Sequence, residues 1–562
     1  MSASSESTFA PPRLAAAAMR LATGLLILSA LAALAPVPTS AATYYVDALG
    51  LGGEAADENP GTREQPWLTP LHAFGAAQPG DTIIFRAGVY RLPRTVHTSD
   101  FAASGGEPLT LTVLPGEHAT ITNLRPIAAD EWTPVPHPDG LALFAAPASR
   151  AFRVSNVVED GVPLRRAPSG DGNDLEDTPP EAIVGPGQWC SNIREGRVWV
   201  ATSDGEPPGD RVEICDVGGF GASGNLFALT AREDGLDVPN LLLDGLTIET
   251  GFHGLLIRTG SATVRRCELR KSYGDLLNAA CGRLQVEDCE FHHFGESAID
   301  VTGATGATPP RPLEPTHIRG CTFHDSLLLR SPGQKGVNAV MLKGGSEDVV
   351  VEGCVFRDME TSYGALTLGG ATSGGLAREG IGLIARNNIF QRITGPWVVL
   401  FAGSEDCVFA NNLVTGSQVR EIVHISRARG DDPETLNVRP RVLSNILFDN
   451  AVEDAIVSID AGAAAGAQID FDLIADSGAR FVIDGEPVAL IDLPARGCEA
   501  HGIGRAPLFR DPAADDFRPA VGSPVIDAGM DLGALVPHDF DAVARPHGAG
   551  PDIGPFEFVP GR

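Results

Sequence analysis

A six-residue pattern that recurs through residues 243–447 limits the possible folds of this chain more than any other feature. Its copies read LDGLTI, VRRCEL, VEDCEF, IRGCTF, VEGCVF, ARNNIF, FANNLV and VLSNIL. The fourth letters of successive copies are 21, 22, 32, 33, 34, 24 and 33 residues apart. The two shortest spacings suit one coil of a parallel β-solenoid, and the longer ones suit the same coil with an added loop. We therefore predict an all-β solenoid with one continuous core.

The fourth position of the pattern predicts a ladder of stacked side chains inside the solenoid. Its members are Cys267, Cys289, Cys321, Cys354, Asn388, Asn412 and Asn445. Stacked asparagine amides hydrogen-bond along the axis and satisfy one another, whereas cysteine serves there as a small buried apolar residue. Disulfides between coils are a rival interpretation, although in-register side chains on parallel strands seldom reach the required torsion. A Cys190–Cys215 disulfide also stays open, since both flank a separate segment.

A second predicted strand follows in each coil, as in AIDVTG and AVMLKGG. Alternation turns Ile299 and Val340 inward and turns Asp300 and Lys343 outward, onto an exposed sheet face. The chain has only three lysines among its 42 basic residues, so a lysine at this place is informative. Long insertions adjoin the same coils, and we expect them to wall a cleft around Lys343; they span 302–316, 324–338 and 369–382.

Residues 1–42 have the features of a secretory signal peptide. Arg13 and Arg20 precede the apolar run LATGLLILSALAALA, and PTSAA then offers small residues for cleavage near Ala41 or Ala42. This run is short for a membrane span, and no later segment is longer. We therefore expect a secreted or periplasmic protein with no membrane span after cleavage.

The formal net charge of -30 argues against nucleic acid and anionic lipid as partners. The same charge opposes a polyanionic sugar unless a local cationic patch or a bound calcium reverses it over one cleft.

Breaks in the repeat divide the chain into five parts. The segment GQWCSNIREGRVWV predicts a hairpin with Gly196 near its turn. The segment TPLHAFGAAQ predicts a short helix that covers the exposed end of the core. The predicted parts are a signal peptide (1–42), an N-terminal cap with the first coils (43–128), a β insertion beside the helix (129–215), the main parallel β-helix (216–470), and C-terminal coils with a closing tail (471–562).

Three segments resemble secreted right-handed parallel β-helix proteins of the pectate-lyase-like superfamily, especially those near alginate lyase and chondroitinase B. They are the start from YYVDALGLGG to DTIIFRAGVY, the middle MLKGGSEDVVVEGCVF, and the end from DFRPAVGSPVIDAG to GPDIGPFEF. The resemblance covers most of residues 43–562 and implies a right-handed parallel β-helix. It leaves the activity open, because this superfamily contains lyases, hydrolases, epimerases and proteins with no known reaction.

The resemblance implies an exported polysaccharide lyase that cleaves an acidic, uronate-containing polysaccharide by β-elimination. That reaction needs a base, neutralisation of the uronate carboxylate and a proton for the leaving oxygen. Lys343 would be the base if neighbouring cations or burial lowered its pKa. Tyr363 would donate the proton, and the carboxylates would be held by Arg330, Lys335 and Arg357.

Asp300 and Glu296 form a candidate calcium site, since carboxylate oxygens are the ligands that calcium prefers. Hydrolysis would instead need a pair of carboxylates in one cleft, and Asp300 has no evident mate in the sequence. The alternative to an enzyme is a non-catalytic β-helix that binds glycans or serves in the cell envelope. We expect a monomer in either case.

Overall fold

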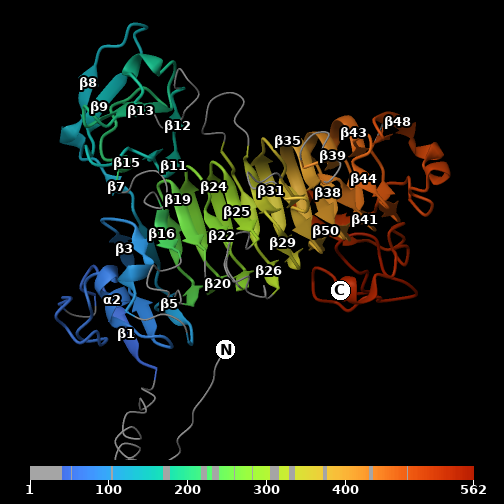
Figure 1. Ribbon diagram of the computed structural model, residues 1–562, viewed down its shortest axis with the longest axis horizontal. Helices are drawn as coiled ribbons and strands as arrows, with labels where there is room; N and C mark the ends of the chain where they lie inside the picture. The colour runs from blue at the N-terminus through green and yellow to red at the C-terminus, as the bar shows by residue number, and fades with distance from the viewer. Residues whose placement is uncertain are drawn as a thin grey trace, which may run out of the picture. The chain divides into compact units, whose positions relative to one another are not determined.

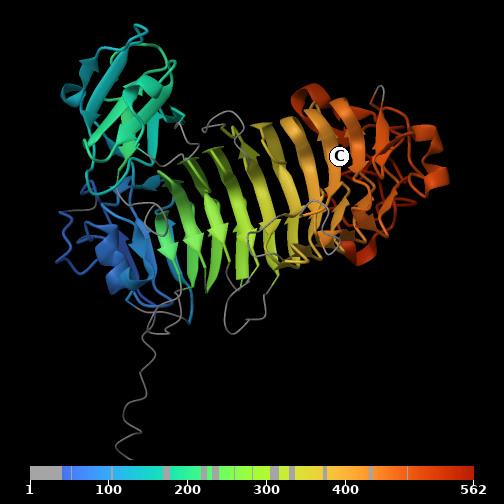
Figure 2. The same ribbon diagram turned by 45° about the horizontal axis from the view of Figure 1, so that its top comes forward.

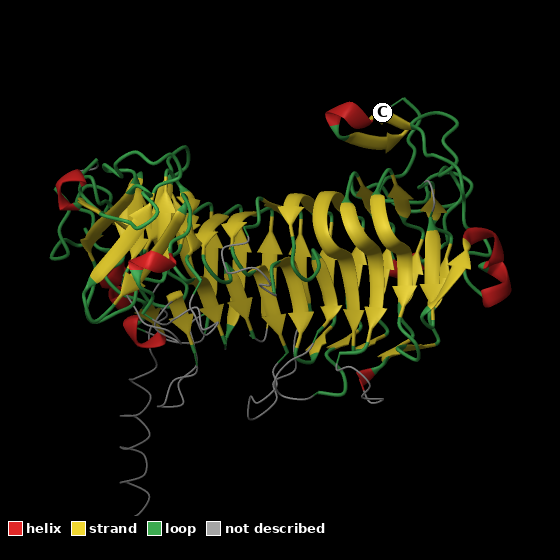
Figure 3. Cartoon of the chain, turned by 90° about the horizontal axis from the view of Figure 1, so that it is seen from above, coloured by secondary structure: helices red, strands yellow, loops and turns green. Residues whose placement is uncertain are grey.

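The computed structural model describes residues 41–561, apart from 52–53, 103–105, 169–176, 217–224, 231–239, 259, 281–282, 304–314, 328–335, 371–375, 429–434 and 477–478. Residues 43–562 form one compact unit. Most of the regular secondary structure in the described chain is strand, and its helices are short (Figure 3). Among the described residues, no helix is both long and apolar enough to cross a membrane.

Two long parallel sheets make up the core of this unit (Figure 1), one of 12 strands and one of 22. The strands of the larger sheet form two rows, called here the second and third sheets. The first sheet contains, in spatial order, β1 (Thr43–Val46), β2 (Thr82–Phe85), β5 (Leu109–Val113), β17 (Leu241–Asp244), β20 (Ser261–Arg265), β23 (Arg283–Glu287), β26 (Thr316–Arg319), β30 (Val349–Glu352), β34 (Ile384–Arg386), β37 (Val408–Ala410), β41 (Arg441–Leu443) and β45 (Gln468–Asp470).

The second sheet follows the recurring turn after each of these strands along the chain. It contains β3 (Gly88–Arg91), β6 (Ala119–Thr122), β18 (Thr247–Glu249), β21 (Glu268–Ser272), β24 (Glu290–Phe294), β27 (Thr322–His324), β31 (Val355–Glu360), β35 (Ile389–Ala402), β38 (Leu413–Thr415), β42 (Ile446–Phe448) and β46 (Leu473–Ile474).

The third sheet carries the candidate site. It contains β4 (Val96–His97), β16 (Asn225–Leu229), β19 (His253–Ile257), β22 (Leu277–Ala279), β25 (Ser297–Thr302), β28 (Asn338–Lys343), β32 (Leu366–Gly369), the second half of β35, β39 (Gln418–Ser426), β43 (Ala451–Ile459), β47 (Arg480–Ile483) and β48 (Glu486–Ala489). Its pairings are parallel up to β47, and β48 closes the sheet as an antiparallel strand.

A short ladder also lines the turn between the third and first sheets in the later coils. Its strands are β29 (Ser346–Glu347), β33 (Gly380–Ile381), β36 (Ser404–Glu405), β40 (Asn437–Val438) and β44 (Ala464–Ala465). Figure 2 shows the strands of successive coils side by side, so the predicted all-β parallel β-helix is confirmed.

The predicted asparagine ladder is also confirmed. Asn388 Nδ2 donates to Asn412 Oδ1 (3.0 Å), and Asn412 Nδ2 donates to Asn445 Oδ1 (3.1 Å). The ladder continues one coil beyond the predicted repeat, where Asn445 Nδ2 donates to Asp472 Oδ1 (2.9 Å). Each amide thus satisfies its neighbour inside the dry core.

Eight of the nine cysteines are described, all eight are buried, and no disulfide joins any two of them. The Cys190–Cys215 disulfide is therefore wrong, because the two thiols belong to different small cores. Cys190 packs with Trp199, whereas Cys215 packs with Leu124 and Val158. The described ladder cysteines form no disulfides between coils either, and Cys281 lies outside the described residues.

The insertion consists of two mainly antiparallel sheets next to the first coils. Its hairpin joins β13 to β14 through Gly196, whose φ of 66° is the left-handed conformation that glycine adopts readily. Asn156 Nδ2 ties the insertion to the β-helix by donating to the Lys271 carbonyl (3.1 Å). The strands are β7 (Arg125–Pro126), β8 (Thr133–Val135), β9 (Leu143–Pro147), β10 (Asn156–Glu159), β11 (Val162–Pro163), β12 (Arg165–Arg166), β13 (Gln188–Asn192), β14 (Arg197–Ala201) and β15 (Val212–Cys215).

Helix α2 (Pro70–Ala76) covers the N-terminal end of the core, as the sequence predicts. The Thr69 side chain caps it, and Phe74 packs against Phe227 of β16. The C-terminal tail contains β49 (Phe509–Asp511) and β50 (Asp516–Pro519) and packs on the outside of the second sheet. The 3₁₀ turns are η1 (Thr98–Asp100), η2 (Ala129–Glu131), η3 (Pro180–Ala182), η5 (Leu490–Asp492), η6 (Pro494–Arg496), η7 (Pro512–Ala514) and η8 (Gly533–Leu535).

Candidate functional site

Strand alternation places the candidate residues on the outer face of the third sheet. Ile299 and Val340 are fully buried in the core, as predicted, so Asp300 and Lys343 on the same strands point the other way. Strands β25 and β28 are neighbours, with Thr302 opposite Lys343. The predicted exposed face is corrected in one respect, because the Lys343 side chain is only 25% exposed.

Lys343 forms an ion pair with Asp300, with Nζ 2.9 Å from Oδ2. Burial acts to lower the pKa of Lys343, but the negative charges of Asp300, Asp275 and Glu296 outweigh it, so the net pKa is raised. The lysine therefore stays an ammonium at neutral pH. This is the opposite of the lowered pKa that the role of a general base requires.

Two more carboxyl groups lie beside this ion pair: Glu296 belongs to the same coil as Asp300, and Asp275 belongs to the coil before it. Oxygens of Asp275 and Glu296 and a ring nitrogen of His253 lie within 4.8 Å of one another. Asp275 is held in place by the Ser297 backbone N–H (3.0 Å) and by Asn278 Nδ2 (2.7 Å). We call Asp275, Glu296 and Asp300 the acid cluster.

Burial and repulsion between neighbouring carboxyl groups raise the pKa of two members of the acid cluster, Asp275 and Asp300. Burial and the charge of Glu296 raise the pKa of Asp275, while burial and the charge of Asp275 raise the pKa of Asp300, against the opposing charge of Lys343. Asp300 therefore does have carboxyl mates, contrary to the prediction from the sequence. Asp275 escaped notice because it stands before the start of a short strand, outside the alternating pattern.

Aromatic side chains continue the same face toward the C-terminus. Tyr363 lies near enough to Lys343 for that charge to act on its phenol, although burial leaves the pKa of Tyr363 raised. Its ring meets Trp397 edge to face at 5.7 Å. Trp397 in turn stacks on His424 at 4.8 Å and donates its Nε1–H to Glu421 (2.8 Å). These contacts hold a rigid, half-buried aromatic surface next to the acid cluster.

The predicted carboxylate-binding residues do not gather around Lys343. Arg357 lies on β31 of the second sheet, where it pairs with Asp358 at 3.1 Å. Strand β31 follows the turn after the first sheet, so its outward side chains belong to a different face of the helix. Arg330 and Lys335 lie outside the described residues, as does most of the insertions that were expected to wall the cleft.

The donor set does not suit the predicted calcium site. Calcium takes about six to eight oxygen ligands, but the Lys343 ammonium already occupies Asp300 Oδ2. At the neighbouring triad, His253 Nδ1 accepts the Asp275 backbone N–H (2.8 Å), which engages the lone pair that would bind a metal. Calcium at Asp300 and Glu296 therefore stays a prediction without support from this geometry.

Comparison with known proteins agrees with the architecture. A family model described as "Right handed beta helix region" matches residues 253–429. A solved structure described as "Glycoside hydrolase" aligns with a TM-score of 0.51 and 11% identity, covering 79% of this chain and 95% of its own. A complex of XylC with xylose aligns with a TM-score of 0.49 and 11% identity, covering 92% and 98%.

No curated protein matches the chain in sequence. At 11% identity the alignment with the glycoside hydrolase concerns the fold alone. Together with the stacked parallel sheets and the family model, it shows that this chain is a right-handed parallel β-helix protein.

Proposed function

We propose that this protein hydrolyses glycosidic bonds in a neutral glycan and that the acid cluster performs the reaction. The observation that carries the proposal is the meeting of Asp275, Glu296 and Asp300 on one outer face of the third sheet. A solved structure with the same fold is described as a glycoside hydrolase, which agrees with this reaction class, but the proposal depends on the cluster itself.

Glycoside hydrolysis needs one protonated carboxyl group and one carboxylate on the same cleft. The raised pKa values of Asp275 and Asp300 favour the protonated form of these groups, because carboxylates this close together cannot all ionise cheaply. Glu296 is half-buried and is the member most open to a substrate. The cluster proton would pass to the leaving oxygen while a remaining carboxylate activates water or attacks the sugar.

The charge of the face favours a neutral substrate over a uronate. Three carboxyl groups surround Lys343, and Glu421 and Asp460 extend the acidic character along the same sheet. A uronate carboxylate placed here would be repelled, whereas the hydroxyl groups of a neutral sugar would find hydrogen-bond acceptors. Trp397 and Tyr363 add apolar surface of the kind that packs against sugar rings.

The β-elimination predicted from the sequence is the second candidate. Lys343 and Tyr363 do share the outer face, which supports it, and the acidic polysaccharide would be its substrate. The raised pKa of Lys343 weighs against its role as the base, whereas the raised pKa of Tyr363 keeps the phenol protonated, as the role of proton donor requires. We also retain export as a proposal, based on the signal features of residues 1–42, with the mature N-terminus as its direct test.

The test measures two products in parallel, with and without calcium. Reducing ends report hydrolysis of xylan, mannan, glucans and galactan, and the ultraviolet absorbance of unsaturated sugars reports lyase action on alginate, pectate, chondroitin and heparan. We expect reducing ends from a neutral glycan, and loss of that activity by at least a hundredfold in Asp275→Asn, Glu296→Gln and Asp300→Asn.

Asp358→Asn is the matched control, since Asp358 is a partly exposed carboxylate on the second sheet that pairs with Arg357 and Arg392. It should leave activity unchanged. Unsaturated product that disappears in Lys343→Ala would replace hydrolysis by β-elimination. Binding of a glycan without either product would make the protein a binding module.

A further inference from the structure

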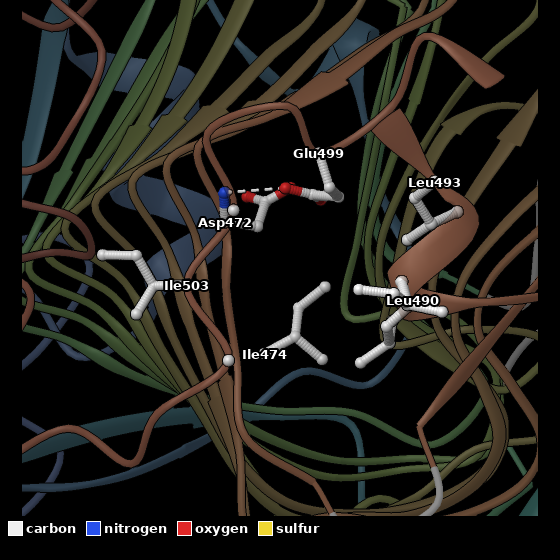
Figure 4. Close-up of a pocket in the computed structure, with 9 residues that line it drawn as sticks. Asp472, Ile474, Leu490, Leu493, Glu499 and Ile503 are labelled. Atoms are coloured by element: carbon white, nitrogen blue, oxygen red, sulfur yellow. Dashed lines mark hydrogen bonds between the residues drawn. The ribbon is translucent and has the colours of Figure 1, made fainter. Parts of the chain in front are cut away.

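A second pocket, of about 340 Å³, opens at the C-terminal end of the β-helix, five coils beyond Lys343. Figure 4 shows it between the last coil and the segment that follows β48, with aliphatic walls from Ile474, Leu490, Leu493 and Ile503. Ile491 stands at its rim with 87% of its surface exposed. A large exposed aliphatic side chain beside an apolar pocket indicates a mouth that receives an apolar group.

Two carboxyl groups form one end of this apolar pocket. Asp472 is fully buried and Glu499 is 8% exposed. One oxygen of each has a partner: Asp472 Oδ1 accepts from Asn445, and Glu499 Oε2 accepts the Asp472 backbone N–H at 3.2 Å (Figure 4). No N–H or hydroxyl group of the described residues reaches the other two oxygens, Asp472 Oδ2 and Glu499 Oε1, and the two carboxyl groups can hydrogen-bond each other only through a proton that they share.

The ladder does not explain why these residues are acids. Asn388, Asn412 and Asn445 perform the same hydrogen bonding one coil after another with amides. An asparagine at position 472 would accept from Asn445 equally well. Two carboxyl groups in an apolar wall are costly unless they hold a proton between them or a cation reaches them, and no lysine, arginine or histidine is among the described residues that line the pocket.

We propose that this pocket binds a small aliphatic molecule that carries a primary ammonium group. The ammonium would donate hydrogen bonds to Asp472 Oδ2 and Glu499 Oε1, and the aliphatic part would lie against Ile474, Leu490 and Leu493 toward the Ile491 rim. A primary ammonium has three donors on one small centre, which matches two convergent carboxyl oxygens. The site is separate from the acid cluster and does not depend on the proposed hydrolysis.

The chemistry disfavours other occupants. A metal ion would find only two carboxyl groups among the described lining residues, far fewer ligands than calcium requires. A neutral aliphatic molecule would fill the walls but leave the carboxyl oxygens unpaired. A carboxylate ligand would be repelled. These differences allow the ligand class to be tested directly.

The test is isothermal titration calorimetry of the purified protein with n-hexylammonium chloride at pH 7. Comparison ligands are n-hexanol, sodium hexanoate, ammonium chloride and calcium chloride. We expect saturable binding of hexylammonium, at least tenfold tighter than that of any comparison ligand. Asp472→Asn and Glu499→Gln should each weaken it at least tenfold, and Ile491→Ser, a change at an exposed position, should weaken it several-fold.

Asp460→Asn is the control, because Asp460 is a half-exposed carboxylate on the outer face of the third sheet. It should bind hexylammonium like the unchanged protein. Equal binding of hexanol, unchanged binding in the Asp472 and Glu499 variants, tighter binding of calcium, or no saturable binding of hexylammonium would each overturn the proposal. Circular dichroism melts of every variant separate lost binding from lost folding.

Discussion

The carboxyl pair at the end of the ladder predicts a gain in stability from one conservative substitution. Burial, together with the charge of Asp472, raises the pKa of Glu499 from 4.5 to about 11. Asp472 is fully buried, and burial raises its pKa as well. Glu499→Gln keeps an oxygen that can accept the Asp472 backbone N–H and adds an N–H₂ group beside Asp472.

The sign and size of the effect follow from linkage. A group whose pKa is raised by folding contributes fully to stability below its unfolded pKa, and that contribution is lost as the pH rises toward its folded pKa. At pH 7 the folded protein holds a Glu499 proton that the unfolded chain would release. One pKa unit is worth about 1.4 kcal/mol, so a span of roughly 2.5 units between 4.5 and 7 costs the folded state about 3 kcal/mol. Glu499→Gln removes this cost.

Urea unfolding at several pH values between 4 and 9 measures the difference. We expect the free energy of unfolding of Glu499→Gln to exceed that of the unchanged protein by about 1 to 3 kcal/mol at pH 7, and by much less at pH 4.5. Glu486→Gln, at an exposed position on β48, is the matched control and should show no such trend. If Glu499→Gln loses stability at every pH by a constant amount, Glu499 is ionised in the folded protein and the reasoning is wrong.

Three further predictions test other parts of the structure. Lys343→Met leaves Asp300 without its cation and should lower the free energy of unfolding by about 2 kcal/mol at pH 8. The loss should be smaller at pH 4.5, where Asp300 takes up a proton. Equal losses at the two pH values in urea unfolding would refute this prediction. Asn412→Leu leaves ladder groups of Asn388 and Asn445 unpaired and should lower the free energy of unfolding by about 3 kcal/mol, whereas a loss under about 1 kcal/mol would show that the ladder contributes little. Thiol titration without reductant should find the eight described cysteines unreactive in the folded protein and reactive after unfolding, and a count below eight in the unfolded protein would reveal a disulfide.

The repeat carried nearly all of the information about the fold. Its fourth letter located the amide ladder because one hydrogen-bonding geometry recurs in coil after coil, so the same residue type is selected each time. The next rung escaped notice because Asp472 differs in residue type from the asparagines before it, and its partner Glu499 comes from outside the strands. Structure that repeats from coil to coil can be predicted from the sequence, whereas the point at which the repeat ends cannot.

Only part of the candidate site could be predicted from the sequence. Alternation correctly turned Lys343 and Asp300 to the outside of the third sheet, but it could not show that Lys343 is three-quarters covered or that Asp300 pairs with it. Arg357 was misplaced because distance along the chain does not reveal the bend that sends β31 to another sheet. Asp275 joined the site through a register that depends on where each short strand begins.

One geometric rule connects the acid cluster with the pair at Asp472 and Glu499. Parallel coils repeat about every 4.8 Å, so carboxyl groups of neighbouring coils, such as Asp275 and Asp300, come close enough to repel each other. Asparagines tolerate this repetition, because each amide is both donor and acceptor, whereas carboxylates do not. At the acid cluster, the Lys343 ammonium offsets part of the repulsion between the carboxyl groups. At Asp472 and Glu499, no cation is among the described residues that line the pocket. Each group of carboxyls must then hold protons or bind a cation. For this reason both places are able to transfer protons or bind ligands, in a scaffold that otherwise repeats one structural unit.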